Sequence, residues 1–182
     1  MSVRHWSIRL TMFGVFAVAS AGALYAQPSQ GDKEIGVAGS LVFQNSSPVS
    51  GSFFADFTGG KYFKDNQYLG VYILPSVNFT TATGGASVGT FGFGGEYEYG
   101  FKAKNDKLWP FVGGAVGGIV SRAGGFGSSS WSGGFQVIPE AGVKYFLDKK
   151  TSLDIVFQVP IEFASGGTSS STQILFGFRH IL

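Results

Sequence analysis

Residues 91–101 read FGFGGEYEYGF, in which aromatic residues at odd-numbered positions alternate with glycine or glutamate at even-numbered positions. Successive side chains of a β-strand point to opposite faces, so an extended chain would carry all its aromatic residues on one face and all its glutamates on the other. A period of two therefore predicts a strand here, with an aromatic face and a small or charged face.

The same period recurs along the chain after Asp32, where no stretch shows the three- and four-residue spacing of an amphipathic helix. Eight strands are expected, at residues 34–44, 51–63, 67–79, 89–101, 108–120, 132–147, 152–164 and 172–182. Most are longer than the roughly five or six residues of an ordinary soluble strand. Their length matches the tilted strands of about nine to eleven residues that cross a bilayer.

The connections between these strands are of two kinds that alternate. Residues 64–66, 102–107 and 148–151 are short and charged. Residues 45–50, 80–87, 121–131 and 165–171 are rich in serine, threonine and glycine, with Arg122 as their only charge. Two chemically distinct ends predict an up-and-down meander, and an even number of strands places both ends of the domain on the charged side. In an outer-membrane barrel, short turns mark the periplasmic side.

The first 26 residues resemble an export signal. Arg4 and Arg9 precede an uncharged apolar run, Leu10 to Ala26, which ends in small residues. We expect a signal peptide at residues 1–26 and one barrel domain at residues 27–182. Cleavage after Ala23 competes with cleavage after Ala26, and a retained membrane helix is the alternative.

Composition excludes several classes of function. The absence of Cys excludes disulfides, a thiol nucleophile, a cysteine-bound metal and a lipid-carrying cysteine. Without Arg4 and Arg9 the chain has 11 basic and 11 acidic side chains, so we expect no broad basic surface and no binding of nucleic acid.

The period of two does not itself decide which face points outward. A soluble barrel buries its apolar face, whereas a transmembrane barrel turns that face to lipid and fills its interior with polar residues. The export signal, the strand length and the many glycines of the polar face favour the transmembrane arrangement, because a narrow eight-stranded interior has little room. Aromatic residues near strand ends would then form interfacial girdles: Phe53, Phe57, Phe63, Trp109, Phe111, Trp131, Tyr145 and Phe157.

Three motifs resemble those of small outer-membrane barrels. Residues 109–117 (WPFVGGAVG) are similar to the strand motif "PYVGxGxG" of such proteins, and residues 139–146 (PEAGVKYF) with Ser152-Leu153 to their "G-V-K/R-Y-F … S-L" hairpin. Residues 59–66 (GGKYFKDN) look like their first periplasmic turn. The chain thus resembles the OmpA/OmpW-like outer-membrane β-barrel domain family over its whole length after residue 26.

This resemblance implies an all-β fold, an eight-stranded antiparallel up-and-down transmembrane barrel in the cell outer membrane. It implies the lipid bilayer and, during insertion, the barrel-assembly machinery as partners, with a monomeric protein. Such chains usually end in an aromatic residue that is read during assembly, whereas this sequence ends in His180-Ile181-Leu182.

With the apolar face outward, eight polar residues are expected to form a structural network in the interior: Glu96, Glu98, Glu140, Lys144, Asp154, Gln158, Glu162 and Arg179. Isolated buried charges are costly, so we expect these side chains to pair and fill the lumen. A polar gate or narrow ion path is the alternative. No catalytic, cofactor-binding or metal site is expected, because His180 is the one histidine after the leader and points to lipid by parity.

The expected function is therefore that of an integral outer-membrane β-barrel protein of a Gram-negative-type envelope, with a structural or surface role and no enzymatic activity or cofactor. A narrow channel, or an OmpW-like passage for small apolar solutes, is the first alternative. A soluble envelope barrel that binds an apolar ligand is the second.

Overall fold

The computed structural model describes residues 27–44, 50–80, 87–125, 128–164 and 167–182. The leader predicted at residues 1–26 lies outside the described residues. So do parts of the four uncharged connections.

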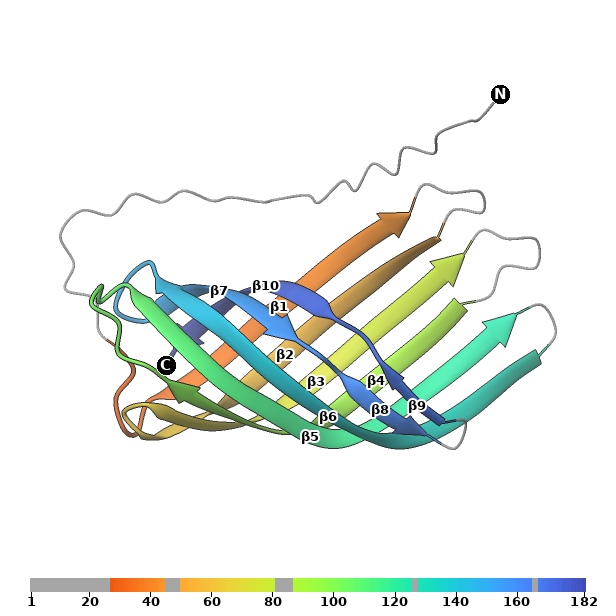
Figure 1. Ribbon diagram of the computed structural model, residues 1–182, viewed down its shortest axis with the longest axis horizontal. Coiled ribbons are helices and arrows are strands. Elements are labelled where there is room, and N and C mark those ends of the chain that lie inside the picture. Colours follow the sequence, from red (N-terminus) through yellow and green to blue (C-terminus); the bar gives the residue numbers. More distant parts are fainter. Residues whose placement is uncertain (1–26, 45–49, 81–86, 126–127, 165–166) are drawn as a thin grey trace, which may run out of the picture.

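The described chain forms one closed antiparallel barrel (Figure 1). Its strands are β1 (Lys33–Gln44), β2 (Ser50–Lys64), β3 (Gln67–Thr80), β4 (Ser87–Gly100), β5 (Leu108–Gly125), β6 (Ser128–Phe146), β7 (Thr151–Gln158), β8 (Ile161–Ala164), β9 (Gly167–Ser170) and β10 (Gln173–Ile181). Each of β1 to β6 pairs with the next strand, β10 pairs with β7, and β1 pairs with β10 to close the ring. The described residues contain no helix long and apolar enough to cross a membrane.

The prediction of eight barrel strands is confirmed, although the last two are each made of two pieces. β7 and β8 together pair with β6, and β9 and β10 continue as their partners. The interruption falls at Val159 and Pro160. Proline has no backbone N–H and cannot donate to a ladder. The Pro160 carbonyl still accepts a hydrogen bond from Ser171 N at 3.2 Å, so the wall is bent rather than broken.

The prediction that residues 121–131 form a loop is wrong. The β5–β6 ladder continues in unbroken register from Val120 opposite Gly133 to Gly125 opposite Ser128. Apolar residues alternate along β5 only as far as Val120, which is where we expect the lipid-facing part of the wall to end. Backbone pairing needs no apolar side chain, so the hairpin continues past that point. Residues 167–170, also expected in a loop, form β9 for the same reason.

The three charged connections lie at one end of the barrel, which we call the turn end; the opposite end is the tip end. Connections at residues 65–66, 101–107 and 147–150 lie there, together with the start of β1 and the end of β10 (Figure 1). Leu182 N donates to the Lys33 carbonyl at 2.9 Å and ties the last residue to the first strand.

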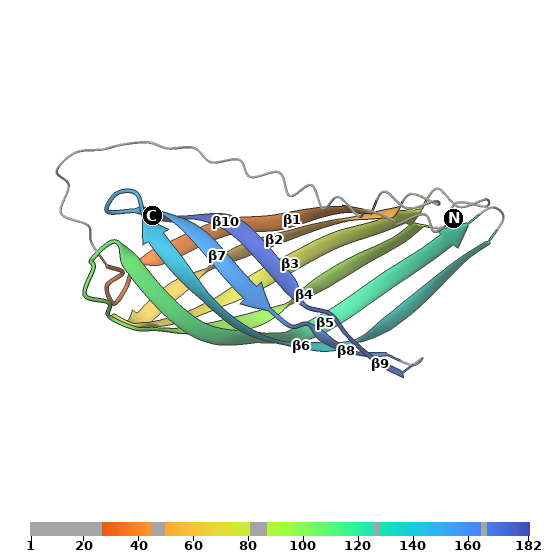
Figure 2. The ribbon, with the colours of Figure 1, turned by 45° about the horizontal axis from the view of Figure 1, so that its top comes forward.

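The wall is incomplete between β1 and β9. β1 pairs with β2 along its whole length, but with β10 only over Glu34–Gly39. β9 pairs only with β8 among the described strands, and it diverges from β1 toward the tip end (Figures 1 and 2). Extending the β1–β10 register places Leu41 opposite Ile174, and both are outward and about half exposed. We call the facing edges of residues 40–44 and 167–175, which do not pair with each other, the seam.

Candidate functional site

The two faces of the wall are inverted relative to a soluble protein. Apolar side chains cover the outside along every long strand; on β7, for example, Ile155 is 55% exposed and Phe157 48%. The alternate residues of the same strand, Asp154 and Gln158, are almost fully buried in the interior. A soluble barrel would need the reverse, so the exposed apolar surface is suited to lipid rather than to water.

The centre of the interior is an ion-pair cluster of Glu34, Glu98, Lys144, Asp154 and Arg179, supplied by five different strands. Lys144 Nζ lies 2.7 Å from Glu34 Oε1 and 2.8 Å from Glu98 Oε2. Arg179 bridges three acids, with Nη1 at 2.7 Å from Glu98 and 3.1 Å from Glu34, and Nε at 2.6 Å from Asp154. Each cation therefore compensates several carboxylates, which lowers the cost of burying all of them.

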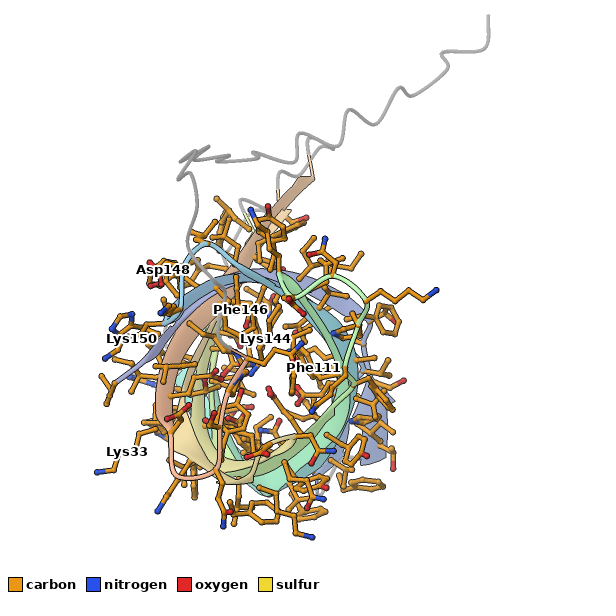
Figure 3. All side chains as sticks on the ribbon, turned by 90° about the vertical axis from the view of Figure 1, so that its left-hand side faces the viewer. Lys33, Phe111, Lys144, Phe146, Asp148 and Lys150 are labelled. Carbon is orange, nitrogen blue, oxygen red and sulfur yellow. The ribbon has the colours of Figure 1, made fainter. Side chains whose placement is uncertain are left out.

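Aromatic rings surround the two cations of this cluster. Lys144 Nζ is 5.4 to 5.5 Å from the ring centres of Tyr62, Tyr68 and Phe111, and it also hydrogen-bonds to Tyr62 Oη at 2.8 Å. Tyr62 in turn donates to Glu34 at 2.9 Å. Figure 3, viewed from the turn end, shows Lys144 and Phe111 pointing into the barrel. The cluster is thus packed on several sides by rings that favour a cation.

Glycines in the wall make room for these long side chains. A Cβ at Gly36 would lie 2.9 Å from Arg179 Cγ, directly across the β1–β10 pair. A Cβ at Gly113 would lie 2.8 Å from Glu140 Oε1. At Gly36 a larger residue would displace the Arg179 side chain, and at Gly113 it would also meet the backbone carbonyl of Tyr97, so neither position has room for a side chain.

Carboxylates outnumber cations in the interior. Seven acids point inward, namely Glu34, Asp56, Glu96, Glu98, Glu140, Asp154 and Glu162, against Lys144 and Arg179. The buried oxygens Asp56 Oδ1, Glu96 Oε1, Glu140 Oε1 and Tyr68 Oη have neither a hydrogen bond nor an ion pair with another described residue. Buried polar atoms are normally satisfied, so these four are the natural positions for water or protons in the lumen.

The remaining residues of the expected network lie apart from the cluster. Gln158 is buried and its Nε2 donates to Gln173 at 2.9 Å. Glu162 is half-buried opposite Gln136, toward the tip end, where it accepts a hydrogen bond from Ser169 at 3.3 Å. The structure therefore joins Glu98, Lys144, Asp154 and Arg179 directly, and places the other four around them or beyond.

The sequence interpretation missed several interior residues. Glu34 is the most central, and Asp56, Tyr62, Tyr68 and Gln136 also point inward. Parity was the available signal, because Glu34 and Asp56 alternate with the outward Ile35 and Phe57. Inward tyrosines give no such signal, since an aromatic residue on a barrel strand is expected to face lipid.

Two of the expected girdle residues are inside. Trp109 and Phe111 are each only 2% exposed and pack with Phe146, Val156, Leu175 and Ile181 in an apolar interior cluster. Bulky residues occupy both faces of this strand, so alternation alone does not assign them. The pairing with β6 assigns the faces: Leu108 and Val112 lie on the outer face, so the alternate residues Trp109 and Phe111 point inward. A second apolar interior cluster holds Tyr72, Leu74, Ala115 and Ile138.

His180 lies on the outer face at the turn end, half-buried, with Nδ1 at 3.1 Å from Thr151 Oγ1. The Thr151 hydroxyl also hydrogen-bonds to the carboxylate of Asp148, which can only accept. The one histidine of the described residues thus lies outside the ion-pair cluster, beside a turn residue.

A closed eight-stranded barrel with an apolar outside and a charged, paired interior defines a β-barrel membrane protein. No protein-family model matches the sequence, and no curated protein sequence is similar enough to match it.

Solved structures share the fold. Neisserial surface protein A superposes with a TM-score of 0.60 at 14% identity, over 83% of this chain and 96% of that one. The attachment invasion locus protein Ail of Yersinia pestis, in complex with the heparin analogue sucrose octasulfate, gives 0.53 at 8% identity, over 84% and 100%. The N-terminal β-barrel domain of Pseudomonas aeruginosa OprF gives 0.50 at 13% identity, over 84% and 98%. The chain thus has the fold of the small outer-membrane barrels, as its sequence motifs implied.

Proposed function

We propose that the chain is an integral outer-membrane protein of a Gram-negative-type envelope, with a structural or surface role and a lumen closed by its own side chains. The ion-pair cluster carries this proposal. Lys144 on β6 and Arg179 on β10 reach inward from the two neighbours of β7 and meet carboxylates from β1, β4 and β7. An ion crossing the lumen would have to displace these contacts, and breaking a buried pair is costly.

The barrel fold supports the outer-membrane location, and the predicted leader at residues 1–26 supplies the export step. We propose the assembly machinery as a transient partner and a monomer as the final state. The proposed role is not catalytic, because the one histidine of the described residues lies on the outer face, away from the interior carboxylates.

The experiment is heat-modifiability on a gel, combined with membrane fractionation and single-channel recording. A band that shifts on boiling and co-fractionates with the outer membrane is expected of a closed transmembrane barrel. In planar bilayers, the folded protein should give no steady conductance. A protein that is soluble without detergent would overturn the location, and a sustained current would overturn the closed lumen. Mass spectrometry of the exported protein should find Gln27 at its amino terminus, or Leu24 if cleavage follows Ala23.

A second candidate function is passage of small apolar solutes, and the seam favours it. Lipid cannot hydrogen-bond backbone groups, so an unpaired strand edge beside the outward Leu41 and Ile174 is a weak point in an apolar environment. An apolar molecule entering at the tip end would leave sideways there, above the ion-pair cluster.

A disulfide across the seam tests this candidate. The chain has no native cysteine, so in Leu41→Cys combined with Ile174→Cys the only intramolecular disulfide is one between these two positions. Oxidation should stop uptake of an apolar probe into vesicles, and reduction should restore it. Equal uptake by the oxidised and reduced forms would eliminate the seam as a route.

A further inference from the structure

The charges of this barrel are separated along its axis. Carboxylates are in excess in the interior, whereas lysines are in excess at the turn end. Seven exposed lysines lie there without an ion pair to any described residue: Lys33, Lys61, Lys64, Lys102, Lys104, Lys149 and Lys150. The turn end therefore presents a basic rim.

Four aspartates lie at the same end, namely Asp32, Asp65, Asp106 and Asp148, and three of them accept hydrogen bonds from backbone amides. Asp32 accepts a hydrogen bond from Ser29 N at 2.8 Å, and Asp65 from Gln30 N at 2.8 Å. Asp148 accepts from Lys150 N and Thr151 N at 2.7 and 2.8 Å. The four carboxylates offset part of the charge of the seven lysines, but none of them forms an ion pair with these lysines in the described part of the chain, so the ammonium groups remain available for an external anion.

Two of the rim lysines lie close enough together to bind one anion between them. Lys33 on β1 and Lys61 on β2 are direct cross-strand neighbours, and both are exposed on the outer face. Such neighbours have Cβ atoms about 5 Å apart, a spacing at which like charges repel. Figure 3 shows Lys33 pointing away from the barrel. An anion held between the two ammonium groups would remove this repulsion.

The surface next to this pair is apolar. Moving one step toward the tip end, the outward row is Ile35, Gly59 and Val71, which are paired in register. Ile35 is 50% exposed and Val71 63%, and a Cβ at Gly59 would meet only Ile35 Cγ2 at 3.9 Å. Gly59 thus leaves a shallow depression between two exposed apolar side chains. Leu69, beside Lys61, extends the same surface and is 58% exposed.

We propose that Lys33 and Lys61 bind the phosphate of an anionic phospholipid of the inner leaflet, whose acyl chain lies along the depression over Gly59. The inference rests on the proposed placement of the barrel in the outer membrane with its turn end in the periplasm. Charge complementarity identifies the headgroup, and the apolar row beside it identifies a lipid rather than a free anion. Lysine at this level extends its ammonium to the interface while its stem covers apolar surface.

The test titrates the refolded protein in a neutral detergent with phosphatidylglycerol and measures retained lipid by native mass spectrometry. The double variant Lys33→Gln/Lys61→Gln removes two interfacial lysines. It should bind phosphatidylglycerol about 30-fold more weakly than the parent. Lys149→Gln/Lys150→Gln removes the same charge from the same end, away from the apolar row, and should bind like the parent. Lys33→Arg/Lys61→Arg should retain binding.

The controls distinguish binding of a lipid from binding of a free anion, and binding at Lys33 and Lys61 from general attraction to the basic rim. Phosphatidylcholine should bind weakly to every variant, and inorganic phosphate should not compete with phosphatidylglycerol. Equal weakening in the two Gln double variants would show general attraction to the rim and overturn the site. Effective competition by inorganic phosphate would overturn the lipid. Each sample is first checked for the gel shift on boiling; absence of the shift would overturn the membrane barrel itself, whereas a shift without a preference for phosphatidylglycerol would overturn this inference alone.

Discussion

Lys144 Nζ lies 2.7 Å from Glu34 Oε1, and neither side chain exposes more than 1% of its surface. The two residues are 110 positions apart, so this contact joins the first and sixth strands across the lumen. A buried ion pair is not by itself a sign of net stability, since both charges lose their hydration. Removing one of the two residues is nevertheless expected to destabilise the barrel, because the other is left charged and buried.

Replacing Lys144 with Met should therefore destabilise the barrel by about 3–5 kcal/mol, since it leaves Glu34 and Glu98 facing Arg179 alone. The measurement is urea unfolding of the refolded protein in lipid vesicles. Lys149→Met is the matched control, because Lys149 is exposed in a turn and should change stability by less than about 0.5 kcal/mol. Equal stability of the two variants would show that the cluster is solvated and contributes little.

The orientation of the wall gives the next prediction. Arg in place of Ile155 or Phe157, both outward on β7, should cost about 2–4 kcal/mol near the bilayer midplane. Ser130→Arg, at an exposed site near the tip of β6, should be close to neutral. Unfolding in vesicles measures all three variants. If both β7 substitutions are silent, the apolar face does not meet lipid.

Most of the architecture could be predicted from sequence, because lipid contact imposes a strict period of two. The strand at residues 91–101 shows this, with Phe91, Phe93 and Tyr97 outward and Glu96 and Glu98 inward in the structure as alternation predicts. The same rule fails at Trp109 and Phe111, where both faces carry bulky residues and only pairing with β6 fixes the orientation. It also fails beyond Val120, where the ladder continues without apolar side chains.

The interior was less predictable than the wall. Parity assigns a face to Lys144 and Arg179, but not the partners that they meet across the lumen. Those partners depend on the stagger of the closed barrel, which brings Glu34 from the first strand to both cations. The need for glycine at position 36 can likewise be recognised only when the strand pairing places Arg179 opposite it.

The long β5–β6 hairpin should be dispensable above the apolar band. Ser121 and Ser132 are direct partners, so residues 122–131 can be replaced by a two-residue Asn-Gly turn without altering the register below. The shortened protein should still shift on boiling, with stability within about 0.5 kcal/mol of the parent. The same turn placed between Val116 and Val137 removes the buried Ile119 and Gln136 and should prevent folding. Failure of the first variant would show that the hairpin tip packs against the rest of the barrel.

The turn between β6 and β7 gives a prediction for pH. Backbone hydrogen bonds from Lys150 and Thr151 to the Asp148 carboxylate lower its pKa below the ordinary value of 3.8. A carboxyl group whose pKa is lower in the folded state stabilises that state above the unfolded value, and this contribution is lost as the pH falls through the folded value.

The difference in unfolding free energy between the parent and Asp148→Ala should therefore be constant above about pH 5 and shrink below the ordinary value of 3.8. Asp148→Asn keeps an acceptor oxygen but does not titrate, so its difference from Asp148→Ala should not vary with pH. Because Asp148 is exposed, the effect is small, and it is best measured as paired urea midpoints at each pH. A parent-minus-alanine difference that stays constant down to the lowest pH would mean that the turn is held by the amide geometry alone and not by the charge of Asp148.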